Sequence, residues 1–270
     1  MSCSVVLIGC GNMGFALLKG WVSQDASLTV YVVEPVEALA QRAAGIGAEI
    51  VAEVEDLPCD LAPELVVLAV KPQMVVPLLK RSGALSRSGA TFVSVAAGIT
   101  LKTIADALPE GASVIRCMPN TPASIGEGLL ALCLGNSVKV DVAALTESLF
   151  SASGAVAWIE DESLMDAVTA ISGSGPAYVF LFIEALTKAG VELGLPEATA
   201  VQLAKKTVAG AGQMAFLTEA PASLLREQVT SPNGTTAAAL DVFMRDNALL
   251  SLVREATLAA RNRGLELGGA

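Results

Sequence analysis

The first fourteen residues contain the pattern that most constrains the fold, an apolar β-branched run followed by three closely spaced glycines. Val5–Ile8 predicts a strand, and Gly9, Gly11 and Gly14 follow it with the spacing G-x-G-x-x-G. In dinucleotide-binding turns the first glycine permits a tight turn, the second admits a pyrophosphate, and the third lets the next helix pack closely. A helix predicted over Phe15–Val22 would direct its free N–H groups at the phosphates. The alternative is an ordinary strand-to-helix turn in a chain with 24 glycines, but the position between strand and helix favours a cofactor site.

Strand-like and helical stretches alternate from Val5 to Trp158. The predicted strands are Val5–Ile8, Thr29–Val33, Leu65–Val70, Thr91–Val95, Ser113–Cys117, Leu129–Leu132 and Ala155–Trp158. The predicted helices between them are Phe15–Val22, Val36–Ala44, Met74–Ser82, Leu101–Ala107 and Val140–Phe150. Apolar strands that alternate with helices indicate an α/β fold with a mostly parallel sheet covered on both faces, and right-handed crossovers make such a sheet doubly wound.

The pattern changes at Glu160-Asp161-Glu162, after which helical periodicity dominates and no strand is predicted. The predicted helices are Ser163–Ile171, Ala177–Leu193, Pro196–Leu217, Ala222–Val229, Thr235–Met244 and Leu249–Leu267. We therefore expect two domains, a nucleotide-binding domain over residues 1–159 and an all-helical domain over residues 160–270.

The composition excludes several classes of function. The 17 basic and 27 acidic side chains give a net charge of −10 without a basic stripe, which disfavours a nucleic-acid partner. The chain has no histidine, which excludes Ser-His and Cys-His nucleophilic machinery and any histidine acid or base. The five cysteines form no C-x-x-C pair, so we expect no metal site and interpret them as reduced thiols of a cytoplasmic protein.

Apolar residues make up 53 % of the chain although aromatic residues make up only 4 %, so alanine, valine and leucine supply the apolar character. Unbroken apolar runs such as Ala177–Ile183 are far shorter than the roughly 18 residues of a membrane span. The first apolar run is not preceded by the basic residues that are typical of a signal peptide, so we expect it to be a strand. We therefore expect no membrane partner, and we expect part of the apolar surface to be buried between subunits.

Glu34 ends the second predicted strand, where an acidic side chain commonly hydrogen-bonds the adenosine ribose hydroxyls. Glu37 adds negative charge, and no Lys or Arg lies between Val30 and Gln41 to attract a 2′-phosphate. The alternative is a solvated residue at the end of a strand.

Two more segments follow strands at the carboxyl edge of the sheet, where ligands bind in open parallel sheets. Lys71 could reach a ribose hydroxyl or a phosphate, and Pro72 suits the first position of a helix. Small residues after Ser94 leave room for a flat ring such as nicotinamide. The alternatives are a surface lysine and a tight turn that needs small residues for packing.

Three loop-like motifs complete the set. Arg116–Pro122 ends a strand with two prolines, and its alternative is a rigid loop. The glycines of Ser172–Gly175 interrupt a helical region at a cost of roughly 1 kcal/mol each relative to alanine. We interpret that segment as a helix start whose free N–H groups face a ligand, with a plain helix–helix turn as the alternative. Gly234–Thr236 opens another predicted helix and offers a site for a small carboxylate, although, taken alone, this motif is better explained as an ordinary N-cap.

Taken together, these motifs resemble the pyrroline-5-carboxylate reductase family. The resemblance covers nearly the whole chain and keeps the order of the motifs, which are Gly9–Gly14, Ala69–Gln73, Ser94–Gly98, Arg116–Pro122, Asp166–Tyr178 and Ser231–Leu240. The block Asp166–Tyr178 is the most specific of them. The resemblance implies a Rossmann-type domain followed by a helical dimerisation domain, with homodimers that can assemble further into decamers.

The reaction implied is reduction of the C=N bond of 1-pyrroline-5-carboxylate by NADH or NADPH, which gives L-proline. A cyclic imine protonated at nitrogen is already an electrophile, so the absence of histidine fits this chemistry. The main task of the protein is then to place the hydride donor over C5 of the ring.

The resemblance also implies roles for particular residues. Together with the glycine motif and Glu34, it gives the cofactor-binding set Ile8, Gly9, Cys10, Gly11, Asn12, Met13, Gly14, Glu34, Ala69, Val70, Lys71, Pro72, Val95, Ala96 and Ala97. The substrate-binding set is Glu219, Gly234, Thr235, Thr236, Ser172, Gly173, Ser174 and Gly175. Thr236 is the implied catalytic residue, because it matches a threonine whose hydroxyl approaches the ring nitrogen.

Two positions depart from the family pattern. Many members carry serine near the end of the second strand, where this chain has Val33-Glu34, so we expect NADH to work at least as well as NADPH. Asn233 and Thr235 stand where Gly and Ala are often seen, and we expect only modest consequences.

Three other readings remain open from the sequence. A β-hydroxyacid dehydrogenase shares the two-domain plan, but Lys188, Lys205 and Lys206 lack the asparagine four residues later that such enzymes use. A non-catalytic dinucleotide sensor would have no use for the Gly234–Thr236 site. A purely structural helical oligomer leaves Gly9–Gly14 unexplained.

Overall fold

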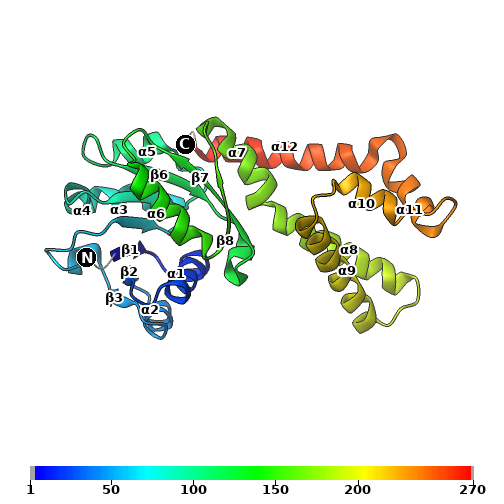
Figure 1. Cartoon of the computed structure of the whole chain (residues 1–270), viewed down its shortest axis with the longest axis horizontal. Coiled ribbons are helices and arrows are strands. Elements are labelled where there is room, and N and C mark those ends of the chain that lie inside the picture. Colours follow the sequence, from blue (N-terminus) through cyan, green and yellow to red (C-terminus); the bar gives the residue numbers. More distant parts are fainter. Residues whose placement is uncertain (1–3, 269–270) are drawn as a thin grey trace. The chain divides into compact units, whose positions relative to one another are not determined.

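The structure is a computed structural model that describes residues 4–268, and these form two compact units (Figure 1). The first, here called the sheet unit, contains the described residues up to Ser174 and those from Ala260 onward. The second, here called the helical unit, is Gly175–Ala259.

The sheet unit is built on one eight-stranded sheet with the order β3-β2-β1-β4-β5-β6-β7-β8. The strands are β1 Ser4–Ile8, β2 Thr29–Val33, β3 Glu49–Val51, β4 Leu65–Leu68, β5 Thr91–Ser94, β6 Val114–Met118, β7 Gly128–Leu134 and β8 Gly154–Trp158. Neighbouring strands are parallel except β6 and β7. The predicted doubly wound, mostly parallel sheet is confirmed, and the strand order reverses between β1 and β4, where such folds bind ligands.

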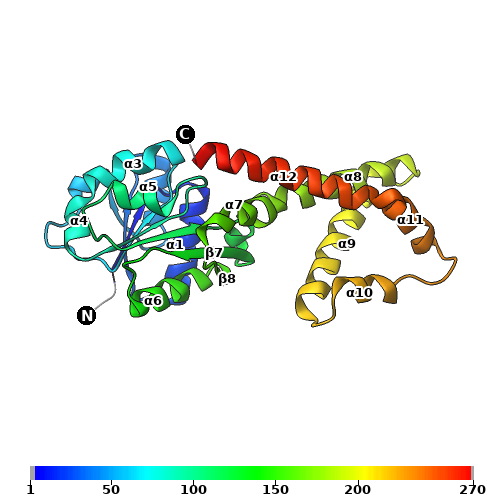
Figure 2. The same cartoon turned by 90° about the horizontal axis from the view of Figure 1, so that it is seen from above.

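Helices cover both faces of this sheet (Figure 2). The regular helices of the unit are α1 Asn12–Gln24, α2 Glu37–Ala44, α3 Pro72–Arg81, α4 Gly83–Arg87, α5 Leu101–Asp106, α6 Val140–Ser151 and α7 Met165–Val168. Short 3-10 turns lie at η1 Val54–Asp56, η2 Thr121–Ile125 and η3 Glu162–Leu164. Successive residues of a strand point to opposite faces of the sheet, and each face has its own apolar core. Leu7 lies in the core with α1, α2 and α6, whereas Val6 lies in the core with α3, α4 and α5.

The sheet unit extends beyond residue 159, where the sequence predicts a domain boundary. Met165 is fully buried, and a Cβ atom at Gly264 of the last helix, α12 (Ala248–Gly268), would lie 3.0 Å from Asp166 Oδ1. Because these contacts belong to the sheet unit, the compact units divide at Gly175 and Ala259. The division into sequence domains at residue 160 remains a proposal.

A π-helix, η4 Thr169–Gly173, replaces the break predicted between two helices. Ser174 N–H donates to Thr169 O at 2.8 Å, and α8 begins immediately afterwards at Gly175 with Pro176 in its first turn. The two glycines are thus accommodated by a wide turn of helix and a single bend. Such π-turns are frequent at functional sites.

The helical unit contains α8 Gly175–Glu192, α9 Glu197–Leu217, α10 Ala222–Gln228, α11 Thr235–Met244, the 3-10 turn η5 Arg245–Asn247 and most of α12. Of its residues, all of which the structure describes, only Ala200 and Ala204 are buried. Large apolar side chains such as Phe180, Leu181 and Leu252 are exposed. These helices therefore carry much more apolar side-chain surface than the unit buries by itself.

The stretch Glu162–Glu192 is long and apolar enough to cross a membrane, and only 6 % of its most apolar window is buried. The prediction from unbroken apolar runs missed this stretch, because isolated polar residues interrupt the runs without removing the apolar average.

Candidate functional site

The glycine-rich turn after β1 requires glycine at two of its three glycine positions. Gly9 has a left-handed φ of +90°, and a Cβ atom there would lie 2.6 Å from Val70 Cγ1 and 2.8 Å from Ala69 O. A Cβ atom at Gly14 would lie 2.3 Å from Gly9 O. The first and third glycines therefore have the structural roles predicted for them, a tight turn and close packing of α1 on the strand.

The second glycine leaves the start of α1 open. Gly11 is the N-cap of α1, no side chain caps the helix, and no heavy atom would lie within 4 Å of a Cβ at that position. The helix begins at Asn12, three residues before the predicted start, so the glycine motif itself forms its first turn. Its first N–H groups and the positive end of its dipole can receive an anion such as a pyrophosphate.

Backbone hydrogen bonds bring the predicted cofactor segments together at one edge of the sheet. Ala69 N–H donates to Ile8 O at 2.8 Å, and Val95 N–H donates to Leu68 O at 3.1 Å. The segments 8–14, 69–72 and 95–97 therefore follow adjacent strands β1, β4 and β5 at their carboxyl ends. Lys71 is exposed as the N-cap of α3, and Pro72 occupies the first turn as predicted.

Glu34 is buried rather than solvated, with 6 % of its surface exposed. Its Oε2 accepts from Cys10 N–H at 2.8 Å and its Oε1 accepts from Val36 N–H at 3.0 Å. The carboxylate thus holds the glycine-rich turn directly, and it keeps further lone pairs for another donor.

Arg42 is a residue at this site that the sequence did not reveal, because it lies directly after the segment Val30–Gln41, where a basic side chain would have indicated a site for a 2′-phosphate. It lies in the last turn of α2, yet its Nη2 donates to Cys10 O at 2.7 Å and to Gly11 O at 3.2 Å. Its guanidinium stands over the Phe15 ring, 4.1 Å from the centroid. The available signal was a single arginine in a short amphipathic helix that follows the acidic residue Glu34.

The buried thiols near the sheet are neutral. Burial raises the pKa of Cys10 to about 11, although Arg42 opposes this shift, and burial also raises the pKa of Cys117. Cys59 is an exposed free thiol, and Cys3 lies outside the described residues. A thiol that stays protonated at neutral pH adds no negative charge to the turn at Cys10.

A buried arginine ties β6 to the segment that leads into the π-helix. Arg116 is 4 % exposed, and its guanidinium lies 3.0 Å from Glu162 Oε1 and 3.7 Å from Asp166 Oδ1. The same Glu162 oxygen accepts from Leu101 N–H at the start of α5. The sequence motif that begins at Arg116 was identified, but this role was not.

Asn120 connects the same motif to the predicted substrate segment. Its Nδ2 donates to Ser172 O at 3.3 Å and to Ser172 Oγ at 3.1 Å, while its Oδ1 accepts from Leu129 N–H at 2.9 Å. The loop after β6 therefore holds the π-helix rather than serving only as a rigid connection.

The predicted carboxylate site lies at the start of α11. Gly234 is the N-cap with extended backbone, no side chain caps the helix, and Asn233 before it has a left-handed φ of 58°. Thr235 is exposed and Thr236 is half-buried, so backbone donors and hydroxyls are available. Glu219 is exposed between α9 and α10.

The predicted substrate residues fall in both units. Ser172, Gly173 and Ser174 belong to the sheet unit, whereas Gly175, Glu219 and Gly234–Thr236 belong to the helical unit. Within residues 4–268 no group of three or more Cys, Asp or Glu side chains could hold a metal ion.

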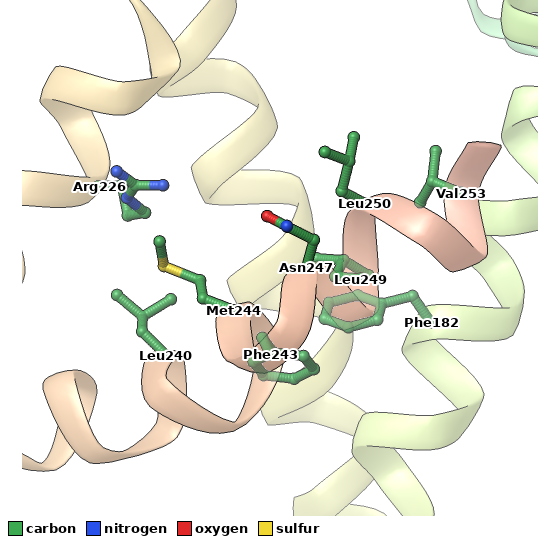
Figure 3. A pocket seen from close by; sticks show the side chains of 9 residues that line it. All are labelled: Phe182, Arg226, Leu240, Phe243, Met244, Asn247, Leu249, Leu250 and Val253. Carbon is green, nitrogen blue, oxygen red and sulfur yellow. The ribbon is translucent and has the colours of Figure 1, made fainter.

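The helical unit also has an apolar groove of about 650 Å³ (Figure 3). It is lined by Phe182, Arg226, Leu240, Phe243, Met244, Asn247, Leu249, Leu250 and Val253. None of the predicted site residues lines it. Its walls are apolar apart from Arg226 and Asn247, which suits a packing partner better than a small carboxylate.

Two family models match the chain. The model described as "Pyrroline-5-carboxylate reductase dimerisation" matches residues 162–267, and the model described as "NADP oxidoreductase coenzyme F420-dependent" matches residues 4–98.

Individual proteins match over nearly the whole chain. Pyrroline-5-carboxylate reductase of Pseudomonas aeruginosa is 37 % identical over 265 residues, which cover 97 % of this chain and 96 % of that protein. The protein of the same name from Pisum sativum is 37 % identical and covers 96 % and 94 %. A solved pyrroline-5-carboxylate reductase from Coxiella burnetii has a TM-score of 0.92 at 33 % identity, covering 99 % of both chains. The Plasmodium falciparum pyrroline carboxylate reductase with NADP bound has a TM-score of 0.83 at 27 % identity, covering 98 % of both.

Proposed function

The chain belongs to the pyrroline-5-carboxylate reductase family and is an oxidoreductase, and we propose that it reduces 1-pyrroline-5-carboxylate to L-proline with NADH or NADPH. The single observation that carries this proposal is the similarity to pyrroline-5-carboxylate reductases over nearly the whole chain. The open, uncapped start of α1, after a turn in which Gly9 admits no side chain, supports the use of a dinucleotide. Such a start supplies backbone donors for the pyrophosphate of a dinucleotide.

The residues present fit a nicotinamide dinucleotide. Gly11 offers open space at the helix start, Glu34 keeps acceptor capacity for a ribose hydroxyl, and Val95–Ala97 presents small side chains. We assign the cofactor to Ile8–Gly14, Glu34, Ala69–Pro72 and Val95–Ala97. When bound, the reduced nicotinamide supplies the hydride that forms the new C–H bond at C5 of the substrate ring.

The chain's other task is to hold the imine. We assign the substrate carboxylate to the N–H groups at the start of α11, Gly234–Thr236, since this helix start lacks a side-chain cap. The Thr236 hydroxyl orients the ring nitrogen or relays its proton. A substrate imine that is already protonated needs no histidine acid, and the chain has no histidine. Ser172–Gly175 and Glu219 complete the proposed substrate contacts.

The exposed apolar helices support a homodimer formed through the helical unit. Association of a second copy would bury the groove of Figure 3 and the exposed side of Glu162–Glu192, which explains their apolar character without a membrane. Dimers would assemble further into decamers, and the protein would act in the cytoplasm on its small-molecule substrate.

For the cofactor we propose that NADH serves at least as well as NADPH. The buried Glu34 carboxylate at the end of β2 would repel a 2′-phosphate, and Glu37 in the first turn of α2 adds to that charge.

The test is oxidation of NADH and of NADPH by the purified protein with 1-pyrroline-5-carboxylate, with L-proline measured as product. Rapid, substrate-dependent oxidation with stoichiometric proline is the expected result. Tight dinucleotide binding without oxidation would contradict the proposal and favour the dinucleotide sensor. A strong preference for NADPH would contradict only the role of Glu34.

A further inference from the structure

The Cys10 residue of the glycine-rich turn is held on both sides by charged side chains, one that directly follows β2 and one in α2. Its N–H donates to Glu34 Oε2 at 2.8 Å, and its carbonyl accepts from Arg42 Nη2 at 2.7 Å. The same Nη2 reaches Gly11 O at 3.2 Å, so one guanidinium nitrogen holds two successive carbonyl groups.

The direction of these carbonyls fixes the direction of the N–H groups that matter for a dinucleotide. Every peptide bond among residues 4–268 is trans, and in a planar trans peptide the C=O and the following N–H point in opposite directions. With the carbonyls of Cys10 and Gly11 turned to Arg42, the N–H groups of Gly11 and Asn12 point away from it. These N–H groups lie at the uncapped start of α1.

Arg42 is itself held in place. Its guanidinium lies over the ring of Phe15, in the first turns of α1, and its backbone belongs to the last turn of α2. Cation–π contact and two carbonyl acceptors restrict the side chain to one arrangement. The Gly11 carbonyl has a second donor, since it also accepts from Phe15 N–H at 2.9 Å. The Cys10 carbonyl accepts from Arg42, so removal of Arg42 would free the Cys10–Gly11 peptide group to rotate, as the wide conformational range of glycine allows.

We propose that Arg42 is a positioning residue for the cofactor, which orients the Cys10–Gly11 peptide group so that the Gly11 N–H faces the pyrophosphate. This inference rests on the proposed use of a nicotinamide dinucleotide. It differs from recognition of a 2′-phosphate, because a pyrophosphate is common to NADH, NADPH and ADP-ribose whereas the 2′-phosphate is present in NADPH alone.

The test compares the binding of these three ligands to wild type, Arg42→Leu and Arg42→Lys by titration calorimetry. Arg42→Leu is expected to raise the Kd of all three ligands by a similar factor of about tenfold, as loss of one charge-assisted hydrogen bond does. Its kcat at saturating cofactor should stay within about twofold of wild type, because the residue does not touch the reacting atoms. Lysine retains the charge with a single donor group and should recover part of the affinity.

Two further variants control for the loss of a positive charge and for a failure of Arg42→Leu to fold. Arg87→Leu removes an exposed positive charge from the same unit and should leave all three Kd values unchanged. If Arg42→Leu does not fold, Phe15→Leu loosens the guanidinium while it keeps an apolar side chain, and it should weaken the three ligands by about twofold to threefold.

Unchanged Kd values in Arg42→Leu, or in Phe15→Leu where that variant is needed, would overturn the proposal. A loss confined to NADPH would also overturn it, since Arg42 would then contact the 2′-phosphate. ADP-ribose binding requires no imine, so a wild type that binds ADP-ribose but does not oxidise NADH with 1-pyrroline-5-carboxylate would contradict the proposed function and leave this test intact.

Discussion

The start of α1 and the start of α11 have the same local design but differ in their support. Both helices begin after a glycine N-cap without a side-chain cap. At α1 the preceding turn is held by a buried carboxylate, by an arginine and by the strands β1 and β4. At α11 the surrounding helical unit buries only Ala200 and Ala204. We therefore expect the start of α1 to be preorganised within one chain, and we expect the start of α11 to become equally rigid only when a second copy packs against the helical unit.

The largest effect is expected from a charge placed in the apolar groove of the helical unit. Phe243→Asp would put a carboxylate where a partner chain should pack, so we expect dissociation to monomers and a loss of turnover of at least roughly 100-fold. Analytical ultracentrifugation and steady-state kinetics measure both. Val140→Asp is the matched control, since Val140 is 88 % exposed on α6 of the sheet unit; an equal loss in the control would remove the distinction between the two units.

The next effect tests the rigid turn. A Gly14→Ala side chain would approach Gly9 O to 2.3 Å, so backbone must move and we expect at least about 3 kcal/mol lower stability together with loss of measurable NADH binding. Denaturant unfolding and NADH fluorescence titration report the two quantities. Gly83→Ala meets only the Arg87 side chain at 3.4 Å and should change neither. Wild-type NADH affinity in Gly14→Ala would show that the turn is more adaptable than described.

A smaller effect is expected at the start of α11. Thr236→Ala should lower kcat or raise the KM for the imine by roughly tenfold, the effect of one well-placed hydrogen bond, and leave the Kd of NADH unchanged. Thr236→Ser keeps the hydroxyl and should restore most of the activity. Unchanged kinetics in the alanine variant would exclude Thr236 from the mechanism.

The smallest effects concern chemical reactivity of the thiols. Cys59 is exposed, while burial raises the pKa of Cys117 and keeps it as a neutral thiol. At neutral pH a maleimide should therefore label Cys59 within minutes and Cys117 far more slowly, as peptide mapping by mass spectrometry would show. Equal labelling rates would mean that the sheet opens frequently.

The sheet was the more predictable half of the molecule. Runs such as Thr29–Val33 are apolar because both faces of the sheet are covered, and their bounds agree with the structure. The three-residue edge strand β3, Glu49–Val51, was missed because it is short and partly exposed. The strand expected over Leu65–Val70 ends at Leu68, since Ala69 and Val70 already belong to the turn beside Gly9.

Site residues that belong to a local sequence motif could be predicted. Site residues that only the tertiary structure brings together could not. The glycine spacing at Gly9–Gly14 is a local requirement and was read directly. Arg42 contacts Cys10, 32 residues away in the sequence, and Asn120 contacts Ser172, 52 residues away. Hydrophobic periodicity reports only on local structure, so it could not predict either contact. The π-helix at Thr169–Gly173 was predicted as a break, because the wide hydrogen bond to Ser174 has no distinct sequence pattern.

The most direct test of the contrast between the two halves is to measure NADH affinity and imine-dependent turnover of the wild type on dilution through the dissociation of its oligomer. We predict that turnover per chain falls with the fraction of monomer while the Kd of NADH stays constant, because the glycine-rich turn is complete in one chain. Turnover that persists in the monomer, or an NADH affinity that falls together with turnover, would contradict the account.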